Sequence, residues 1–222
     1  MILVTTFFVI FLKFNVTERF APASYLKMQN DTDQYLIQQT LAGDTRAYGQ
    51  LVSRYQDLVY TVAIRMMKVR EEAEEVAQDS FIKAYESLES YRGESKFSSW
   101  LYSIVYRKSL DRLRKNKRSQ TTELLETITA DQAANVEHAL ARLEAEERKE
   151  YIRACIAQLP EQEAALVTFY YFEELSVKEI AAITDLSVDN IKVKLYRSRK
   201  KLFSLLKDFV LPEYSNSNGQ AI

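Results

Sequence analysis

Apolar residues recur every three or four positions along most of the 222-residue chain, and this spacing predicts amphipathic helices. Only 4 glycines and 3 prolines interrupt the pattern, which argues against a sheet-rich fold. We therefore expect an all-α protein. Its expected helices cover 33–41, 44 to about 67, 71–88, 100 to about 117, 161–170, 176–184 and 188–202, with helical structure resuming from 138.

Residues at the expected helix ends suit their positions. Gly43 is a natural C-terminal stop, and Asp44 can cap the helix that follows. Ser98 or Ser99 is expected to cap the fourth helix. Pro160 opens a later helix at a place where its missing amide hydrogen does no harm.

Near the C-terminus, two helices are joined by a tight turn. Ser176 and Glu179 form a capping-box pattern that starts the first of them. Asp185 lies at the turn, where Asp tolerates a left-handed backbone, and Ser187 can cap the second helix. This arrangement is typical of a helix-turn-helix, which places its second helix in the major groove of DNA.

That second helix has an apolar side and a basic side. The apolar stripe consists of Val188, Ile191, Leu195, Ser198 and Leu202. Residues 192–207 hold seven basic residues and no acidic one, which favours a polyanion as partner. The residues that we expect to contact DNA are Asn190, Lys192, Val193, Lys194, Tyr196, Arg197, Arg199 and Lys200. The alternative is a surface helix hairpin whose charges are merely solvated.

Charge is unevenly distributed although the net charge is only -1. Residues 107–118 hold seven basic residues and one acidic residue, forming a second basic block. Between the two blocks, residues 123–150 hold eight acidic and three basic residues. Two separate basic segments suggest two contacts with a polyanion.

The helix that carries the first basic block also carries aromatic residues. Trp100, Tyr102 and Tyr106 alternate there with arginines and lysines. Cations can follow a phosphate backbone while aromatic faces stack on unpaired bases. Alternatively, the aromatic side chains belong to the core and the basic ones are solvated, and for Trp100 the two interpretations have equal weight.

Acidic residues crowd the third helix, away from its apolar stripe. That stripe consists of Ala73, Val76, Ala77, Phe81, Ala84 and Leu88. Early acidic residues suit the positive end of the helix dipole. For Gln78 and Asp79 the sequence shows no obvious internal partner, so we expect them to face another protein.

Catalytic and metal-binding chemistry is not indicated. The single cysteine, Cys155, allows no internal disulfide, and the single histidine, His138, has no companion ligands for zinc or for a nucleophilic triad. No phosphate-binding glycine loop occurs. We expect no enzyme activity, no metal, no cofactor and no small-molecule substrate.

The first twelve residues are almost wholly apolar, but they are too few to span a bilayer as a helix. They lack a preceding basic region, and charged residues separate them from Ala21-Pro22-Ala23, so a secretion signal is disfavoured. We expect translation to start at Met28 and the protein to be cytoplasmic. The expected divisions are an extension over 1–27, a helical domain over 28–118, a flexible acidic linker over 119–147, a helix-turn-helix domain over 148–210 and a disordered tail over 211–222.

The order of these parts resembles the extracytoplasmic-function (ECF) group of bacterial sigma factors in the sigma-70 family. The resemblance runs from about Gln34 to Leu206, and four motifs in the right order carry it. They are Gly43-Asp44 with Ala47-Tyr48 and Leu51-Val52; AEEVAQDSF over 73–81; FSSWLYSI over 97–104 with LDRLR over 110–114; and Leu159-Pro160 with Glu179-Ile180-Ala181 and residues 188–199.

The resemblance implies a transcription initiation factor that binds core RNA polymerase and directs it to particular promoters. The polymerase would be bound by Glu75, Gln78, Asp79 and Phe81. The melted minus-ten element would be opened and read by Tyr91, Ser98, Trp100, Tyr106, Arg107, Arg112 and Arg114. The helix-turn-helix would read the duplex minus-thirty-five element, and an anti-sigma protein, often membrane-bound, would mask these surfaces.

The chain departs from the group at two positions. Arg107 stands where the group often has Asn, and Asp185 replaces the usual turn glycine. Two other functions compete with the sigma-factor interpretation. One is a one-component transcriptional regulator, whose N-terminal helices would bind a ligand or dimerise. The other is an adaptor tethered to a membrane by residues 1–12.

Overall fold

The computed structural model describes residues 23–115, 135, 136, 138–140 and 142–210. Within these residues the regular structure is helical throughout and no strand occurs, which confirms the expected all-α class. Of the extension expected over 1–27, only residues 23–27 are described, and they already belong to a helix; most of the expected linker and the expected tail over 211–222 lie outside the described residues.

The described residues divide into two compact units. The first unit comprises 23–115 together with 176–187, and the second comprises 135–175 together with 188–210. The helices of the first unit are α2 (Ala23–Leu41), α3 (Thr45–Met67), α4 (Arg70–Glu86), η2 (Leu88–Ser90), α5 (Phe97–Lys115) and α9 (Val177–Thr184). Those of the second are α7 (Ala145–Ala157), α8 (Glu161–Val167), the π-helical turn η3 (Thr168–Phe172) and α10 (Val188–Val210).

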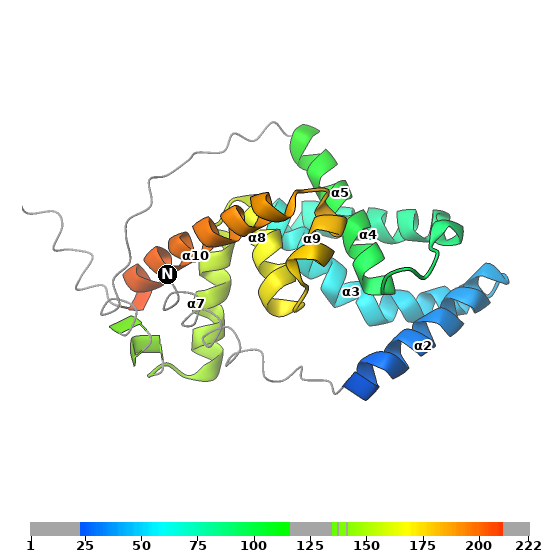
Figure 1. Ribbon diagram of the computed structural model, residues 1–222, viewed down its shortest axis with the longest axis horizontal. Helices are drawn as coiled ribbons and strands as arrows, with labels where there is room; N and C mark the ends of the chain where they lie inside the picture. Colours follow the sequence, from blue (N-terminus) through cyan, green and yellow to red (C-terminus); the bar gives the residue numbers. More distant parts are fainter. Residues whose placement is uncertain (1–22, 116–134, 137, 141, 211–222) are drawn as a thin grey trace, which may run out of the picture. The chain divides into compact units, whose positions relative to one another are not determined.

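In the first unit, α3, α4 and α5 pack side by side, and α2 packs against α3 (Figure 1). Their apolar stripes meet in a core that excludes water. Its fully buried members include Leu51, Val59, Met66, Ala73, Ala84, Leu101 and Val105. In addition, α9 packs against α5, so the structure groups this helix with the first unit, whereas the sequence had grouped it with α10.

The helix ends follow the sequence signals closely. Gly43 has a φ of 102°, a left-handed conformation that glycine adopts without steric cost, and the chain leaves α2 there. The Asp44 carboxylate then accepts a hydrogen bond from the amide of Arg46 at 2.9 Å and caps α3. Lys68, with a φ of 60°, closes the C-terminal end of α3 through its amide to the Ile64 carbonyl.

Two helices are described from residues before their expected starts. The described part of α2 begins at Ala23, well before the expected start at Asp33. α5 begins at Phe97, not after Ser98 or Ser99, because Phe97 is buried and the amide of Trp100 closes a turn on the Lys96 carbonyl at 3.2 Å.

α7 begins at Ala145, three residues before the expected domain boundary. Before α7, Val136 and Leu140 are buried in helical segments within the stretch predicted as linker. Val136 and Leu140 thus contribute to the core although they lie in a largely acidic stretch of the sequence. In α8 and η3, Ala164, Leu166, Val167 and Phe169 are buried as expected, while Tyr170 is only partly so.

A buried carboxylate joins α2 to α3. Asp33 is 3% exposed and accepts hydrogen bonds from the Arg54 guanidinium and the Tyr55 hydroxyl. Burial raises the pKa of Asp33, and the hydrogen bonds from Tyr55 and Arg54 act in the opposite direction. Because a buried carboxyl group needs such partners, this cluster orients α2 on α3.

We predict that Asp33→Ala lowers the free energy of unfolding by about 2–3 kcal/mol, since the guanidinium and the hydroxyl lose a charged acceptor. Urea unfolding followed by circular dichroism measures this loss. Asp57 on α3 is exposed, so Asp57→Ala is the matched control and should change stability by less than about 0.5 kcal/mol. Equal effects of the two substitutions would contradict the role given to Asp33.

Candidate nucleic-acid interface

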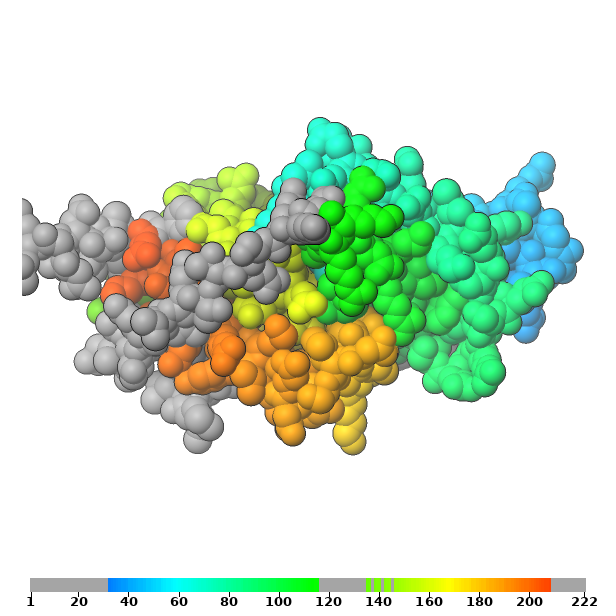
Figure 2. All heavy atoms as spheres, turned by 90° about the horizontal axis from the view of Figure 1, so that it is seen from above, coloured from blue at the N-terminus to red at the C-terminus, as the bar shows by residue number. Residues whose placement is uncertain are grey.

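The first candidate surface lies at the start of α5 and on the loop before it. Tyr91 and Trp100 are partly exposed, with ring centroids 5.4 Å apart. The buried Phe97 ring lies 5.7 Å from Tyr91 and 5.6 Å from Trp100. Ser98 is also partly exposed. Figure 2 shows α5, in green, at the surface of its unit. At this edge the rings of Tyr91 and Trp100 therefore pack on the buried Phe97 ring, and part of each ring remains accessible to solvent.

The arginines of α5 reach the surface, but each has an acidic neighbour. Arg112 forms a two-pronged ion pair with Glu75 of α4, and one of its bonds, from Nη1 to Oε1, measures 3.2 Å. Arg107 lies 3.1 Å from the Asp185 carboxylate, and Arg114 lies 3.2 Å from Asp111. All these pairs are at least partly exposed to water, so the arginines can exchange partners at small cost.

Tyr106 is placed differently from the expectation. It is 1% exposed, as is Tyr102 one helical turn earlier, so both rings belong to the core. Burial raises the pKa of Tyr106 to about 12. Tyr106 was expected to contact DNA because it alternates with basic residues along the helix, but adjacent residues on a helix point in different directions. Its ring is not available to a base in this structure.

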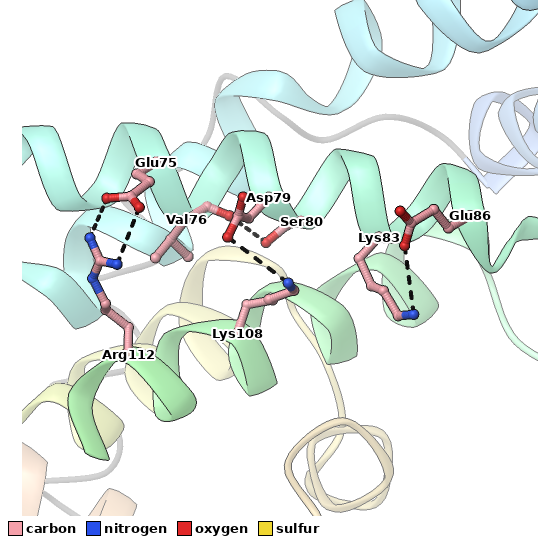
Figure 3. Close-up of polar contacts among 8 residues, drawn as sticks. All are labelled: Glu75, Val76, Asp79, Ser80, Lys83, Glu86, Lys108 and Arg112. Carbon is pink, nitrogen blue, oxygen red and sulfur yellow. Dashed lines mark hydrogen bonds and ion pairs between the residues drawn. The ribbon is translucent and has the colours of Figure 1, made fainter. Parts of the chain in front are cut away.

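The acidic face of α4 is the second candidate surface (Figure 3). Glu75, Gln78 and Asp79 are exposed, and Phe81 is partly exposed. The expectation that Asp79 has no internal partner is wrong, because its carboxylate lies 3.9 Å from the ammonium of Lys108 on α5. α4 and α5 are thus joined by two ion pairs along their exposed edges, the one at Asp79 and the one at Glu75.

Two exposed apolar residues on α4 were missed. Ile82 is 58% exposed and Tyr85 is 45% exposed, although apolar side chains of this size are usually buried. Tyr85 contacts Tyr48 edge to face, with ring centroids 4.9 Å apart. Ile82 lies outside the apolar stripe of α4, and this displacement was the signal that could have identified it.

The turn before α10 has the expected local structure. The Ser176 hydroxyl accepts from the amide of Glu179, and the Glu179 carboxylate accepts from the amide of Ser176 at 2.8 Å, which completes the capping box. These hydrogen bonds lower the pKa of Glu179. Asp185 has a φ of 59°, the left-handed conformation expected for it in place of glycine. α10 begins at Val188, directly after Ser187.

The two sides of α10 agree with the prediction. Ile191, Leu195, Ser198 and Leu202 are buried, together with Phe203 and Leu206, which were not foreseen, while Val188 is only partly buried. The expected DNA contacts lie outward. Asn190, Lys192, Val193, Tyr196 and Arg197 are exposed, and Lys194, Arg199 and Lys200 are partly exposed. Exposed Val193 and Tyr196 supply apolar surface among the cations.

Two of these cations also contact aromatic rings. Arg199 donates from Nε to the Tyr171 hydroxyl at 2.5 Å, which orients its guanidinium within the second unit. The ammonium of Lys200 lies 5.1 Å from the centre of the Tyr196 ring. Arg197 is exposed, and its guanidinium has the forked geometry that suits bidentate contacts with guanine.

Within the described residues, no group of three or more His, Cys, Asp or Glu side chains could hold a metal ion. Cys155 is buried, and burial raises the pKa of its thiol to about 12, so it is a core residue. The same part of the chain contains no helix that is both long and apolar enough to span a membrane.

Comparison with known families gives two matches. Residues 51–119 match sigma-70 region 2, and residues 149–202 match sigma-70 region 4. The first match assigns the N-terminal helices to a sigma-factor domain, so a ligand-binding or dimerising domain of a one-component regulator is set aside.

Individual relatives agree with this assignment. The chain is 32% identical over 182 residues to the ECF RNA polymerase sigma factor SigW of Bacillus subtilis, covering 78% of this chain and 95% of the relative. It is 31% identical over 190 residues to the RNA polymerase sigma-H factor of Pseudomonas aeruginosa, covering 81% and 96%. A solved structure of CnrH in complex with the cytosolic domain of CnrY is 25% identical, with a TM-score of 0.50, covering 79% of this chain and 97% of that one. The chain therefore belongs to the ECF group of the sigma-70 family of RNA polymerase sigma factors, which are transcription initiation factors and not enzymes.

Proposed function

We propose that this sigma factor reads the duplex minus-thirty-five element with the exposed face of α10, and that it captures the melted minus-ten element with the loop over 91–96 and the exposed edge of α5. The observation that carries the proposal is the pairing of cations with exposed aromatic and apolar side chains on both elements. The proposed domain division is the one expected from sequence, a region over 28–118 and a region over 148–210, with the acidic linker between them.

The two elements suit different forms of DNA. α10 is long and basic, and a helix of this kind fits the major groove, where each base pair presents a distinct pattern of donors and acceptors. The edge formed by Tyr91 and Trp100 presents ring faces, which can stack on bases only after strand separation. We propose Ser98, Arg107, Arg112 and Arg114 as its polar contacts and leave out Tyr106.

Core RNA polymerase is the proposed partner of the α4 face. Glu75, Gln78, Asp79 and the partly exposed Phe81 form the contact foreseen from sequence. Ile82 and Tyr85 extend it with apolar area, which an interface needs at its centre. A basic partner surface could compete with Arg112 and Lys108 for the two carboxylates, because these exposed ion pairs are weak.

The proposed setting is the cytoplasm, where the polymerase acts. An anti-sigma protein is the second proposed partner. The similar protein CnrH has been solved in complex with the cytosolic domain of CnrY, which supports a protein partner of this kind for the chain. Such a protein would mask the polymerase-binding and DNA-binding surfaces.

The decisive experiment is a gel-shift titration with promoter DNA, with and without core polymerase, followed by run-off transcription. Free protein should bind duplex DNA weakly because a single small helix-turn-helix buries a modest surface and the single-stranded target does not yet exist. Specific binding and transcripts should appear when core polymerase is added. Tight footprints with twofold symmetry from the free protein, without polymerase-dependent transcripts, would overturn the proposal.

Arg197→Ala should change the preference for minus-thirty-five sequences, because a lost base contact removes about 1–3 kcal/mol of discrimination. Lys200→Ala should weaken binding to all promoter variants alike, as expected for a phosphate contact. Holoenzyme binding to a set of minus-thirty-five variants measures both. Lys207→Ala, near the far end of α10, is the control and should leave binding unchanged. Uniform losses for Arg197→Ala would exclude its base-reading role.

Asp79→Arg should weaken binding to core polymerase while leaving the fold intact, because its ion pair with Lys108 is exposed and spans 3.9 Å. Affinity for core polymerase and thermal melting are the measurements. Asp57→Arg makes the same charge change at an exposed site on α3 and should keep the affinity of the wild type. Unchanged affinity for Asp79→Arg, with unchanged melting, would show that this face does not bind polymerase.

A further inference from the structure

The loop over 91–96 is tied to a helix that carries none of the proposed contacts. Gln34 of α2 donates from its side-chain nitrogen to the Tyr91 hydroxyl at 3.3 Å, although the two residues are 57 positions apart. The same hydroxyl donates to the Ser95 carbonyl at 2.6 Å. Tyr91 therefore closes the loop on itself and ties it to α2.

The hydroxyl that makes both contacts stays protonated over the ordinary pH range. Burial raises the pKa of Tyr91, and the hydrogen bond from Gln34 acts in the opposite direction. A protonated phenol can accept one hydrogen bond while it donates another, which is the arrangement seen here. The link to Gln34 and the link to Ser95 thus coexist.

The backbone of the loop follows the Gln34 side chain closely. Gly93 has a φ of 73°, and a Cβ atom built there would lie 3.4 Å from the Gln34 side-chain nitrogen. The loop thus bends over the amide in a conformation that favours glycine. Residues 92–96, which include Arg92 and Lys96, are all exposed, so this bend determines where their side chains meet a ligand.

The Tyr91 ring rests on a fixed base. It contacts Phe97 edge to face, and Phe97 lies 5.5 Å from the buried Tyr55 ring. Tyr55 is in turn hydrogen-bonded to Asp33, the residue before Gln34. Two adjacent residues of α2 therefore support the loop. Asp33 acts through Tyr55 and Phe97, on which the Tyr91 ring packs, and Gln34 acts directly on the Tyr91 hydroxyl.

We infer that Gln34 is a positioning residue for minus-ten recognition, which acts through the Tyr91 hydroxyl to hold the loop over 91–96 in the shape that receives an unpaired base. This inference rests on the proposed function, since it assigns a supporting residue to the proposed minus-ten site. Gln34 itself need not touch DNA. Its contribution is to fix the loop before the strand arrives, which lowers the entropy cost of binding.

The first test uses the free, full-length protein. Trp100 is the only tryptophan in the chain and contacts Tyr91, so its fluorescence reports on the loop. Acrylamide quenching of Trp100 should increase in Gln34→Ala to the level of Tyr91→Phe, and the double variant should show no further increase. Gln38→Ala, at an exposed site one turn along α2, is the matched control and should match the wild type.

The second test uses holoenzyme and a single-stranded oligonucleotide carrying the nontemplate minus-ten strand of a promoter that the wild-type holoenzyme transcribes. Gln34→Ala should weaken binding roughly threefold to tenfold, the range expected for one net hydrogen bond. Affinity for core polymerase and for duplex minus-thirty-five DNA should stay unchanged. In a Tyr91→Phe background, Gln34→Ala should have no further effect.

The two tests can distinguish a failure of the role given to Gln34 from a failure of the proposed minus-ten site. Unchanged quenching and unchanged oligonucleotide affinity in Gln34→Ala would overturn the positioning role, while weaker binding by Trp100→Ala would still support the minus-ten site. Equal losses of core, duplex and single-strand binding would show general destabilisation and would also overturn it. If wild-type holoenzyme shows no preference for the minus-ten strand, the proposed function fails, and the inference fails with it whatever the quenching shows.

Discussion

The buried carboxylate of Asp33 is the interaction on which the proposed DNA-binding end of the first unit depends. A carboxyl group that is 3% exposed must have hydrogen-bond donors, and Arg54 and Tyr55 supply them. Tyr55 also packs on Phe97, the buried first residue of α5, with ring centroids 5.5 Å apart. The ring of Tyr91 and the proposed base-capturing edge then rest on Phe97. The polar contact between α2 and α3 thereby supports, through Tyr55 and Phe97, a surface formed by the loop over 91–96 and the start of α5.

Charge sharing between α4 and α5 explains how a chain with a net charge of -1 can bind both a polyanion and a large protein. Glu75 and Asp79 lie opposite Arg112 and Lys108, so each basic group has a local partner until another ligand replaces it. Exposed ion pairs of this kind contribute at most about 1 kcal/mol. In the proposed function, pairs this weak can exchange with phosphate or with a partner protein.

α10 must meet two requirements at once: its backbone must be held in place, and its basic side must stay exposed to solvent. Its buried side includes Ser198, whose hydroxyl donates to the Lys194 carbonyl at 2.8 Å and also lies 3.3 Å from Glu163 of α8. Arg199 is held by Tyr171. These contacts anchor the helix within the second unit and leave Arg197 and its exposed neighbours accessible for the proposed DNA contacts. Direct reading of bases requires such pre-set side chains, since each misplaced donor loses its hydrogen bond.

The sequence by itself determined the all-α class and the main helices, the caps at Asp44 and Ser176, the left-handed turn at Asp185 and the basic side of α10. All these follow from contacts between residues a few positions apart, which periodicity and capping chemistry describe. Only the tertiary structure decided that Tyr106 is buried, that Asp79 has a partner in Lys108 and that Gln34 lies under the loop. Helical periodicity shows that one side of α5 is buried but cannot tell whether an aromatic residue at its margin faces the core or the solvent. Ion pairs and hydrogen bonds between distant segments depend on how helices pack, and local sequence carries no record of that packing.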